Sequence, residues 1–311
     1  MKRVLITGGA GTVGTAFMKR YPDYEYYNVS RNEEQIANLK AQSFYSNDFP
    51  EVKNYIADIR SLETLITIFN KVKPDVVIHA AAMKHVNLAE ENPTTASTVN
   101  VVGSLNVIKA SIAAEVPLTI GISTDKACSP DNTYGYTKKI MEQLFFENHT
   151  TKNKFVCTRF ANVANSNGSV IPFFKQCEKD GKPIKLTDEN MNRLMFSTTT
   201  AAELIHAAME FGELSETSFI LSRKMKNVNM LKLAQCFKGP IQLVGKRPGE
   251  KLNETLISES ELEYTSVDAD DYIFIEPKVT PVELRLDKEL SSVTAPDMTQ
   301  EELKDLIWTK E

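Results

Sequence analysis

The sequence has few cysteines, no long apolar run and no excess of positive charge. Its cysteines, Cys128, Cys157, Cys177 and Cys236, form neither a Cys-x-x-Cys pair nor a Cys/His spacing, so neither a disulfide framework nor a metal site is indicated. No apolar run reaches the roughly 18 residues of a membrane-spanning helix, and no signal peptide precedes Lys2. The net charge of −5 is spread over mixed signs, unlike a nucleic-acid-binding surface. We therefore expect a cytoplasmic protein with mostly buried free thiols, no metal, and no membrane or nucleic-acid partner.

A glycine-rich segment follows the first apolar run. Residues Lys2–Thr7 predict a buried strand, and residues Thr15–Arg20 form an amphipathic segment. Between them the spacing is Gly-x-x-Gly-x-x-Gly, which allows a sharp turn, close approach to a pyrophosphate and tight packing of a helix on a strand. In this context the spacing predicts dinucleotide binding. The residues assigned to the cofactor here are Thr7, Gly8, Gly11, Thr12, Val13 and Gly14.

The second predicted strand, Tyr24–Val29, ends at Ser30 and Arg31 rather than at an acidic residue. A carboxylate at this point binds the ribose 2′-hydroxyl of NAD, whereas an arginine accommodates the 2′-phosphate of NADP. The pair therefore favours NADP. A second interpretation makes Ser30 the N-cap of the next helix, with Glu33 as its capping-box partner and Arg31 in solvent; the two interpretations are compatible.

Strands and helices alternate through the first half of the chain. Further strands are predicted near 54–57, 75–80, 117–122 and 155–159, and helices over 62–72, 95–114 and 134–148. Such repeated βα units with apolar strands predict an α/β fold, a Rossmann-type doubly wound parallel sheet. Ligands collect at the carboxyl ends of its strands, which adds Asp58, Ile59, Ala80, Ala81 and Ala82 to the cofactor residues. We expect residues 1–160 to form this domain and residues 161–311 to form a smaller, partly interleaved α/β substrate lobe, ending in helix 299–307 after a loose polar stretch at 291–300.

Reactive side chains are concentrated between residues 120 and 138. Tyr134 and Lys138 share one face of a predicted helix. An ammonium and a cationic nicotinamide near a phenol would lower its pKa and make Tyr134 a general base. Thr124, Asp125 and Lys126 follow the preceding strand and add a hydroxyl, a carboxylic acid and an amine to the same region. Asn100, within the helix predicted over 95–114, has either a packing role or a role in holding that helix open near the active site, and the histidines are expected to be structural.

These residues carry a resemblance. The chain resembles an extended short-chain dehydrogenase/reductase and, within that superfamily, is similar to the soluble UDP-N-acetylglucosamine 4,6-dehydratases of the polysaccharide-biosynthesis type. The matching segments are Thr-Gly-Gly-Ala-Gly-Thr-Val-Gly at 7–14, Ser-Arg at 30–31, His-Ala-Ala-Ala-Met-Lys-His-Val at 79–86, Ser-Thr-Asp-Lys-Ala at 123–127, Tyr-Gly-Tyr-Thr-Lys at 134–138, Arg-Phe-Ala-Asn-Val at 159–163, Gly-Ser-Val-Ile-Pro at 168–172 and Arg-Pro-Gly-Glu-Lys at 247–251. The chain departs from the family at Ala161, where glycine is usual, and at 164–168, where an arginine is missing. Its Tyr134 stands where membrane-anchored relatives often have methionine.

The resemblance implies a lyase with an internal hydride cycle on tightly bound NADP. Tyr134, supported by Lys138, would remove the C4 hydroxyl proton. Lys126 would take the C5 proton, because a buried, lone lysine next to the oxidised nicotinamide would have a lowered pKa. Asp125 would protonate the departing C6 hydroxyl. The implied product is UDP-2-acetamido-2,6-dideoxy-L-arabino-4-hexulose, which is formed by inversion at C5. The resemblance also implies that the enzyme is a homo-oligomer. The implied substrate residues are Lys84, Asn162, Ser169, Val170, Arg247 and Glu250, of which Arg247 suits a diphosphate and Glu250 a ribose. The alternatives are a C5-retaining dehydratase, a UDP-hexose 4-epimerase and a non-catalytic NADP-binding sensor or scaffold.

Overall fold

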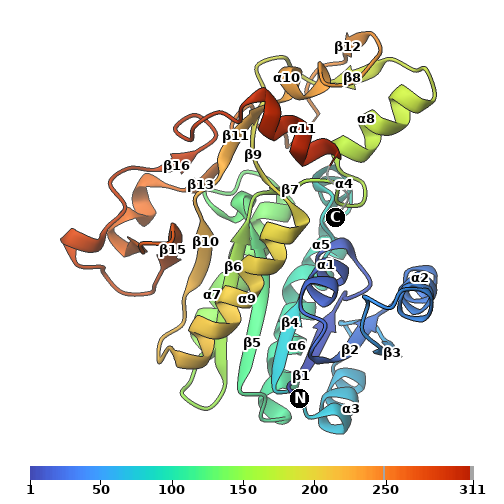
Figure 1. Cartoon of the computed structure of the whole chain (residues 1–311). Helices are drawn as coiled ribbons and strands as arrows, with labels where there is room; N and C mark the ends of the chain where they lie inside the picture. Colours follow the sequence, from blue (N-terminus) through green and yellow to red (C-terminus); the bar gives the residue numbers. More distant parts are fainter. Residues whose placement is uncertain (248, 309–311) are drawn as a thin grey trace.

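A large, mostly parallel β-sheet with helices on both faces forms the body of the protein (Figure 1). The computed structural model describes residues 1–247 and 249–308. Within these residues nine strands pair in the order β14 (Thr265–Val267), β15 (Tyr272–Ile275), β10 (Ile220–Arg223), β6 (Lys154–Phe160), β5 (Leu118–Thr124), β4 (Val76–His79), β1 (Arg3–Thr7), β2 (Glu25–Ser30) and β3 (Val52–Ile56). All neighbouring pairs from β10 to β3 are parallel, and β15 and β14 extend the sheet in antiparallel pairs. The predicted fold class is confirmed.

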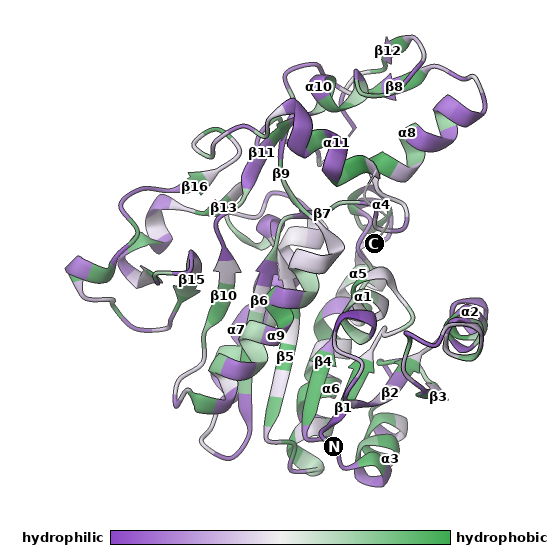
Figure 2. Cartoon of the chain, viewed as in Figure 1, coloured by the Kyte–Doolittle hydropathy of each residue, from purple (hydrophilic) through white to green (hydrophobic). Residues whose placement is uncertain are grey.

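The central strands are apolar because helices cover both of their faces. Val4, Leu5 and Ile6 of β1 are fully buried, and so is Ile120 in the middle of β5. Figure 2 shows the hydrophobic residues running along β4 and β5. The strand order reverses between β1 and β4, which is the point where sheets of this kind bind their ligands.

Helices pack in two layers against this sheet. On one face α1 contacts α9, and on the other α6 contacts both α3 and α7. The bounds are α1 (Thr12–Arg20), α3 (Leu62–Val72), α6 (Gly103–Ala113), α7 (Thr133–Asn148) and α9 (Thr198–Leu214). In α3, Leu65, Ile68, Phe69 and Val72 recur at three- and four-residue spacing and are all buried, so one apolar stripe fixes the face that meets the sheet.

The helix after β2 begins at a different cap from the one predicted. In α2 (Glu33–Tyr45) the side chain of Asn32 accepts a hydrogen bond from the backbone N–H of Gln35 at 3.0 Å. The hydroxyl of Ser30 instead donates to the side-chain oxygen of Asn28 at 2.7 Å. The interpretation of Ser30 as the N-cap with Glu33 as its partner is therefore wrong, because an asparagine, an equally good cap, lies closer to the helix.

The second half of the chain adds a smaller unit beyond the carboxyl ends of the parallel strands (Figure 1). Its elements are β7 (Asn162–Val163), β8 (Ile184–Leu186), β9 (Asn192–Phe196), β11 (Lys226–Asn229), β12 (Ile241–Leu243), β13 (Thr255–Ile257), β16 (Leu290–Ser291), α8 (Val170–Lys179), α10 (Met230–Ala234) and α11 (Gln300–Trp308). Its own apolar core includes the fully buried Phe174 and Leu233. From the same half of the chain, α9 contacts α1, β5 and β6, and β10 pairs with β6 in the large sheet.

The expectation of a loose polar stretch at 291–300 is wrong. Strand β16 pairs with β13, and the side chains of Ser291 and Ser292 are buried. The backbone N–H of Asn227 donates to the carbonyl of Pro296 at 2.8 Å. The stretch is ordered because it is hydrogen-bonded to residues distant in sequence, such as Asn227 and Glu254, which local sequence does not show.

Candidate active site

The predicted acid/base residues lie where β5 ends. The chain passes from Thr124 into a short 3₁₀ turn, η2 (Asp125–Ala127). The Thr124 hydroxyl donates to Oδ1 of Asp125 at 2.8 Å, and the Lys126 ammonium donates to the same oxygen at 3.1 Å. Oδ2 of Asp125 is buried and has no hydrogen-bond partner among the described residues. A buried oxygen of this kind is costly unless a ligand satisfies it, so this carboxyl group is suited to bind a substrate hydroxyl.

Lys126 lies between two carboxylates. Its Nζ is 3.1 Å from Oδ1 of Asp125 and 3.4 Å from Oε1 of Glu254. Burial lowers the pKa of Lys126, but the two carboxylates together raise it by more, so the net shift is upward. The expectation of a lone lysine with a lowered pKa is therefore wrong for this geometry.

Tyr134 faces the same turn from α7. Burial raises the pKa of Tyr134 to about 12, and the nearby Lys126 charge opposes this shift. The Lys138 ammonium donates to the backbone carbonyl of Ile122 at 2.8 Å, and burial lowers the pKa of Lys138 to about 8. The lowering of the Tyr134 pKa expected from Lys138 is therefore wrong, because burial outweighs the one opposing charge, that of Lys126. The contribution expected from a cationic nicotinamide stays a prediction.

A π-helical turn holds the loop after β4 beside α7. The helix predicted over 95–114 is three consecutive elements, namely α5 (Pro93–Ser97), the π turn η1 (Thr98–Val102) and α6. In the turn, Asn100 accepts a hydrogen bond from the N–H of Met83 at 2.8 Å and donates to the Met83 carbonyl at 3.0 Å. It also donates to the Thr137 hydroxyl of α7 at 3.0 Å. Asn100 thus joins three segments that border the site.

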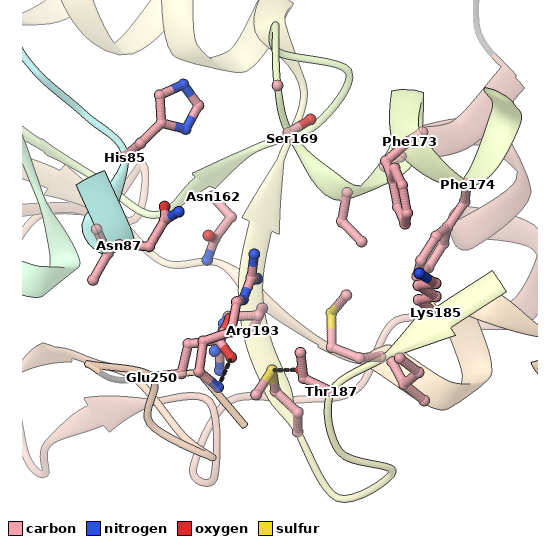
Figure 3. Close-up of a pocket in the computed structure, with 18 of the residues that line it drawn as sticks. His85, Asn87, Asn162, Ser169, Phe173, Phe174, Lys185, Thr187, Arg193 and Glu250 are labelled. Carbon is pink, nitrogen blue, oxygen red and sulfur yellow. Dashed lines mark hydrogen bonds and ion pairs between the residues drawn. The ribbon is translucent and has the colours of Figure 1, made fainter. Parts of the chain in front are cut away.

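A cavity of about 990 Å³ opens beside η2 and is lined by residues of both units. Figure 3 shows the apolar rings of Phe173 and Phe174 on α8, and Arg193 on β9, among the side chains that line it. Residues predicted to bind the substrate line this cavity without exception: Lys84, Asn162, Ser169, Val170, Arg247 and Glu250. Of the predicted catalytic residues, Lys126 lines it, whereas Thr124, Asp125, Tyr134 and Lys138 do not.

Two of these cavity residues are already paired with each other. The Arg247 guanidinium donates twice to Oε1 of Glu250, at 2.6 and 3.0 Å, and the Arg247 backbone N–H donates to Oε2. A planar fork of this kind can exchange a carboxylate for a phosphate. Pro248, between them in the predicted motif, lies outside the described residues. The hydroxyl oxygen of Ser169 is buried and has no hydrogen-bond partner among the described residues, so it too is suited to a ligand.

The segment that lacks the family arginine connects the cavity to the glycine-rich loop. The Lys84 ammonium donates to the carbonyl of Asn167 at 2.6 Å, and the N–H of Asn167 donates to the Thr12 hydroxyl at 3.1 Å. Gly168 has φ +74°, and a Cβ there would come within 2.8 Å of the His85 ring. Backbone groups therefore make the contacts at this point of the chain.

The glycine-rich loop has the geometry of a diphosphate cradle. Gly8 has φ +72°, and a Cβ there would come within 2.8 Å of the backbone nitrogen of Ala81. A Cβ on Gly14 would come within 2.5 Å of Gly9, so α1 can start this close only with glycine. No side chain caps α1 at Gly11, and the first backbone N–H groups of the helix can bind an anion. The Thr7 hydroxyl is hydrogen-bonded to Nδ1 of the buried His79 at 2.7 Å, a structural contact.

Two arginines share one carboxylate at the ends of β2 and β3. Nη1 of Arg31 is 3.6 Å from Oδ2 of Asp58, and Arg60 pairs with the same carboxylate at 2.6 Å. The hydrogen bond from Arg60 is the main reason that the pKa of Asp58 lies below its ordinary value, and the charge of Arg31 adds to the effect. One positive charge remains in excess, which suits a phosphate group.

Sequence reasoning missed the charged partners behind the site. Glu254 faces Lys126, and Glu142 pairs with Arg159 at 2.8 Å; Glu142 and Arg159 are completely buried. A buried ion pair could have been predicted for Arg159, because it stands near the end of an otherwise apolar strand and a buried charge requires a partner. The sequence does not show which carboxylates supply them.

Metal ligands and reactive thiols do not gather elsewhere in the part of the chain that the structure describes. In residues 1–247 and 249–308, no group of three or more His, Cys, Asp or Glu side chains could hold a metal ion. Cys128, Cys157 and Cys177 are buried free thiols, and Cys236 is partly exposed, which confirms the expectation for the cysteines. No helix in the same residues is long and apolar enough to span a membrane.

Comparison with known proteins identifies the family. Residues 4–277 match the family described as polysaccharide biosynthesis protein. The chain is 33% identical over 303 residues to a UDP-N-acetylglucosamine 4,6-dehydratase (inverting) of Campylobacter jejuni, which covers 94% of this chain and 88% of that protein. It is 32% identical over 278 residues to a UDP-glucose 4-epimerase of Rickettsia bellii, which covers 84% of this chain and 79% of that protein. The X-ray structure of Pen from Bacillus thuringiensis has a TM-score of 0.90 at 30% identity and covers 100% of this chain and 98% of that one. This chain therefore belongs to the polysaccharide biosynthesis protein family.

Proposed function

We propose that this protein is a UDP-N-acetylglucosamine 4,6-dehydratase that inverts C5 and forms UDP-2-acetamido-2,6-dideoxy-L-arabino-4-hexulose. The observation that carries the proposal is the contact between Asp125 and Lys126 at 3.1 Å beside Tyr134. Oxidation at C4 requires one base, whereas loss of water across C5 and C6 requires a further base and an acid. The turn η2 offers both groups. The relative of Campylobacter jejuni is named as an inverting 4,6-dehydratase, which supports inversion at C5.

We further propose that the cofactor is NADP, tightly bound and regenerated in each turnover. The cradle of Gly8, Gly11 and Gly14 fits a diphosphate, and the excess positive charge at Arg31 and Arg60 fits a 2′-phosphate. A bound nicotinamide would supply the hydride acceptor for C4 and the hydride donor for C6. The residues assigned to the cofactor are Thr7, Gly8, Gly11, Thr12, Val13, Gly14, Ser30, Arg31, Asp58, Ile59, Ala80, Ala81, Ala82, Tyr134 and Lys138.

In this proposal the residues of the chain move the protons. Tyr134 takes the proton of the C4 hydroxyl, and Lys138 favours its phenolate form once the site is filled. Lys126 exchanges its ammonium proton with Asp125, so that a neutral amine faces C5 and a carboxylic acid faces C6. The amine takes the C5 proton, the C–H electron pair forms the C5–C6 double bond, and the C6–O bond breaks. Asp125 gives its proton to the departing oxygen, which leaves as water, and this restores the charges of Asp125 and Lys126. Once a hydride has reached C6, C5 takes a proton, and Tyr134 can return the one that it took from the C4 hydroxyl, which restores its phenolate.

The cavity is assigned to the UDP-sugar. Arg247 suits the diphosphate and Glu250 the ribose hydroxyls, because guanidinium binds phosphate in a planar fork and carboxylate accepts from hydroxyls. Residues 161–311 then mainly bind the substrate, while residues 1–160 bind the cofactor and carry the catalytic groups. A cytoplasmic location and a homo-oligomeric state are parts of the same proposal.

Incubation of the purified protein with UDP-N-acetylglucosamine, followed by proton NMR, tests the function. The expected product shows a C6 methyl doublet and no C4–H signal. A UDP-hexose 4-epimerase, the alternative suggested by the relative of Rickettsia bellii, would instead give the C4 epimer with its C6 hydroxymethyl group intact. An unchanged substrate would reject both activities.

A further inference from the structure

Glu254 is a buried carboxylate to which the catalytic steps above give no role. It immediately precedes β13, is 5% exposed and lines the cavity together with Lys126. Its Oε1 is 3.4 Å from Nζ of Lys126 and 3.9 Å from Nε of Arg193. Two backbone contacts fix its position: its N–H donates to the Ser292 hydroxyl at 3.0 Å, and its carbonyl accepts from the Ser292 N–H at 2.8 Å.

The charged groups around Lys126 come from several elements, and their negative and positive charges are equal in number. Asp125 lies on η2, Glu254 comes from the segment before β13, and Arg193 comes from β9. Tyr134 of α7 is the neutral titratable group that faces them. Two carboxylates therefore stand against two cations. A buried cluster with this balance can relocate a proton without leaving an uncompensated charge, which would be costly.

Arg193 contacts both Glu254 and the backbone of the loop that is proposed to bind the substrate. Its guanidinium donates to the carbonyls of Lys251 and Leu252 at 3.0 and 3.2 Å. The loop that carries Arg247 and Glu250 therefore leads directly into Glu254. Burial raises the pKa of Glu254, and the Lys126 charge opposes this shift, so the carboxylate depends on its cationic partners.

We infer that Glu254 is a positioning residue for C5 deprotonation, which holds the Lys126 nitrogen in the cavity wall and stabilises the ammonium that forms when Lys126 takes the C5 proton. This inference rests on the proposed function, in which Lys126 is the base. In that step the C5–H bond breaks, an N–H bond forms on Lys126, and Asp125 loses its proton to the departing hydroxyl. Asp125 then again carries a negative charge, and Glu254 supplies the second negative charge next to the new ammonium.

The test measures C5 deuterium exchange in D₂O by NMR against pH, with C4 oxidation followed separately by absorbance of the reduced nicotinamide in single turnovers. In Glu254→Gln the rate of C5 exchange should fall about tenfold or more, and C4 oxidation should change little. The pH range over which exchange rises with pH, called its pH limb here, should move to lower pH, because Lys126 has lost a negative partner. The matched control is Glu259→Gln, an exposed glutamate of the next turn, which should behave as wild type.

The possible results distinguish a failure of the role inferred for Glu254 from a failure of the proposed dehydratase function. If Glu254→Gln matches the control in exchange rate and pH limb, Glu254 has no positioning role and the dehydratase proposal stands. If the wild-type protein forms no 4-keto-6-deoxy product, the proposed function fails first. Should Glu254→Gln unfold too early to assay, Glu254→Asp carries the test: it keeps the charge, so its exchange should slow while its pH limb stays in place. Wild-type exchange in Glu254→Asp would overturn the inference.

Discussion

Lys138 donates a hydrogen bond from its ammonium nitrogen to the backbone carbonyl of Ile122, 2.8 Å away in the strand that delivers η2. One turn earlier on α7, Tyr134 has a pKa raised to about 12 by burial, and Lys126 opposes this rise. The phenol is thus protonated at neutral pH when only the side chains of the protein surround it. In the proposed mechanism, the positive charge of the bound nicotinamide adds to that of the lysines, and the phenolate forms when the site is filled.

Tyr134→Phe should lower turnover by at least about 10²-fold, the usual worth of a positioned acid or base, and leave UDP-sugar affinity within a few fold. The ring is kept and only the hydroxyl is lost, so packing should change little. Turnover is measured by NMR and affinity by calorimetry. Tyr136→Phe on the same helix, where the side chain is 54% exposed, is the control. Near-wild-type turnover in Tyr134→Phe would remove this residue from the mechanism.

Arg31→Asp should weaken binding of NADP(H) and improve binding of NAD(H). The substitution removes the guanidinium 3.6 Å from Asp58 and adds a carboxylate that can accept from a ribose 2′-hydroxyl. Titration of cofactor-stripped protein with both nucleotides measures the preference. Lys40→Asp, the same charge change at an exposed position of α2, controls for net charge. An unchanged ratio of the two affinities would mean that Arg31 does not contact the 2′-phosphate.

Local sequence predicted the parts of the fold that local physics determines. The apolar stripe from Leu65 to Val72 gave α3 its bounds, and the glycine spacing predicted the loop in which Gly8 approaches Ala81. The cap of α2 was missed because Ser30 and Asn32 are both good caps and only the three-dimensional position of β2 decides between them.

The rest of the site depends on contacts between distant residues. Lys126 was expected to be a lone base, yet Glu254, far along the chain, lies 3.4 Å from it, and Asp125 and Glu254 together reverse the downward pKa shift that burial alone would cause. The polar residues Ser291 and Ser292 were expected in a loose stretch, yet they are buried beside β13. Neither of these two contacts, Lys126 with Glu254 and residues 291–292 with β13, can be read from a periodic pattern in the sequence, because a single long-range contact has no regular spacing.

Glu261→Gln should destabilise the protein near neutral pH and flatten its loss of stability in acid. Arg159 is fully buried and pairs with Glu142 at 2.8 Å and with Glu261 at 2.9 Å. Burial raises the pKa of Glu261, but Arg159 lowers it by more, so the net value lies well below the ordinary 4.5. Glu261 therefore contributes stability above its unfolded pKa, and this contribution is lost as pH falls through the lower folded pKa.

Urea unfolding at a series of pH values from about 7 downward measures this contribution. At pH 7 the variant should lose about 3 kcal/mol, the lower end of the cost of breaking a buried pair, because Arg159 keeps Glu142. Below about pH 5 the wild-type and variant curves should converge. Glu259→Gln, exposed in the same turn, should follow the wild type throughout. Parallel curves for Glu261→Gln and the wild type would show that this pair does not titrate with folding.

The reaction run in D₂O should place one deuterium at C5 in a product of L-arabino configuration. The 4-keto, 5,6-ene intermediate is planar at C5, so the configuration depends on which face receives the returning proton. Inversion requires a donor on the face opposite the base, and Tyr134, which holds the proton of the C4 hydroxyl, or water can serve while Lys126 occupies the other face. Lys126→Ala should abolish C5 exchange and still allow some C4 oxidation. Lys152→Ala, at an exposed loop position, should keep both C5 exchange and C4 oxidation at the wild-type level. An early NMR spectrum with only the D-xylo 4-keto sugar would reject inversion and leave the dehydratase activity standing.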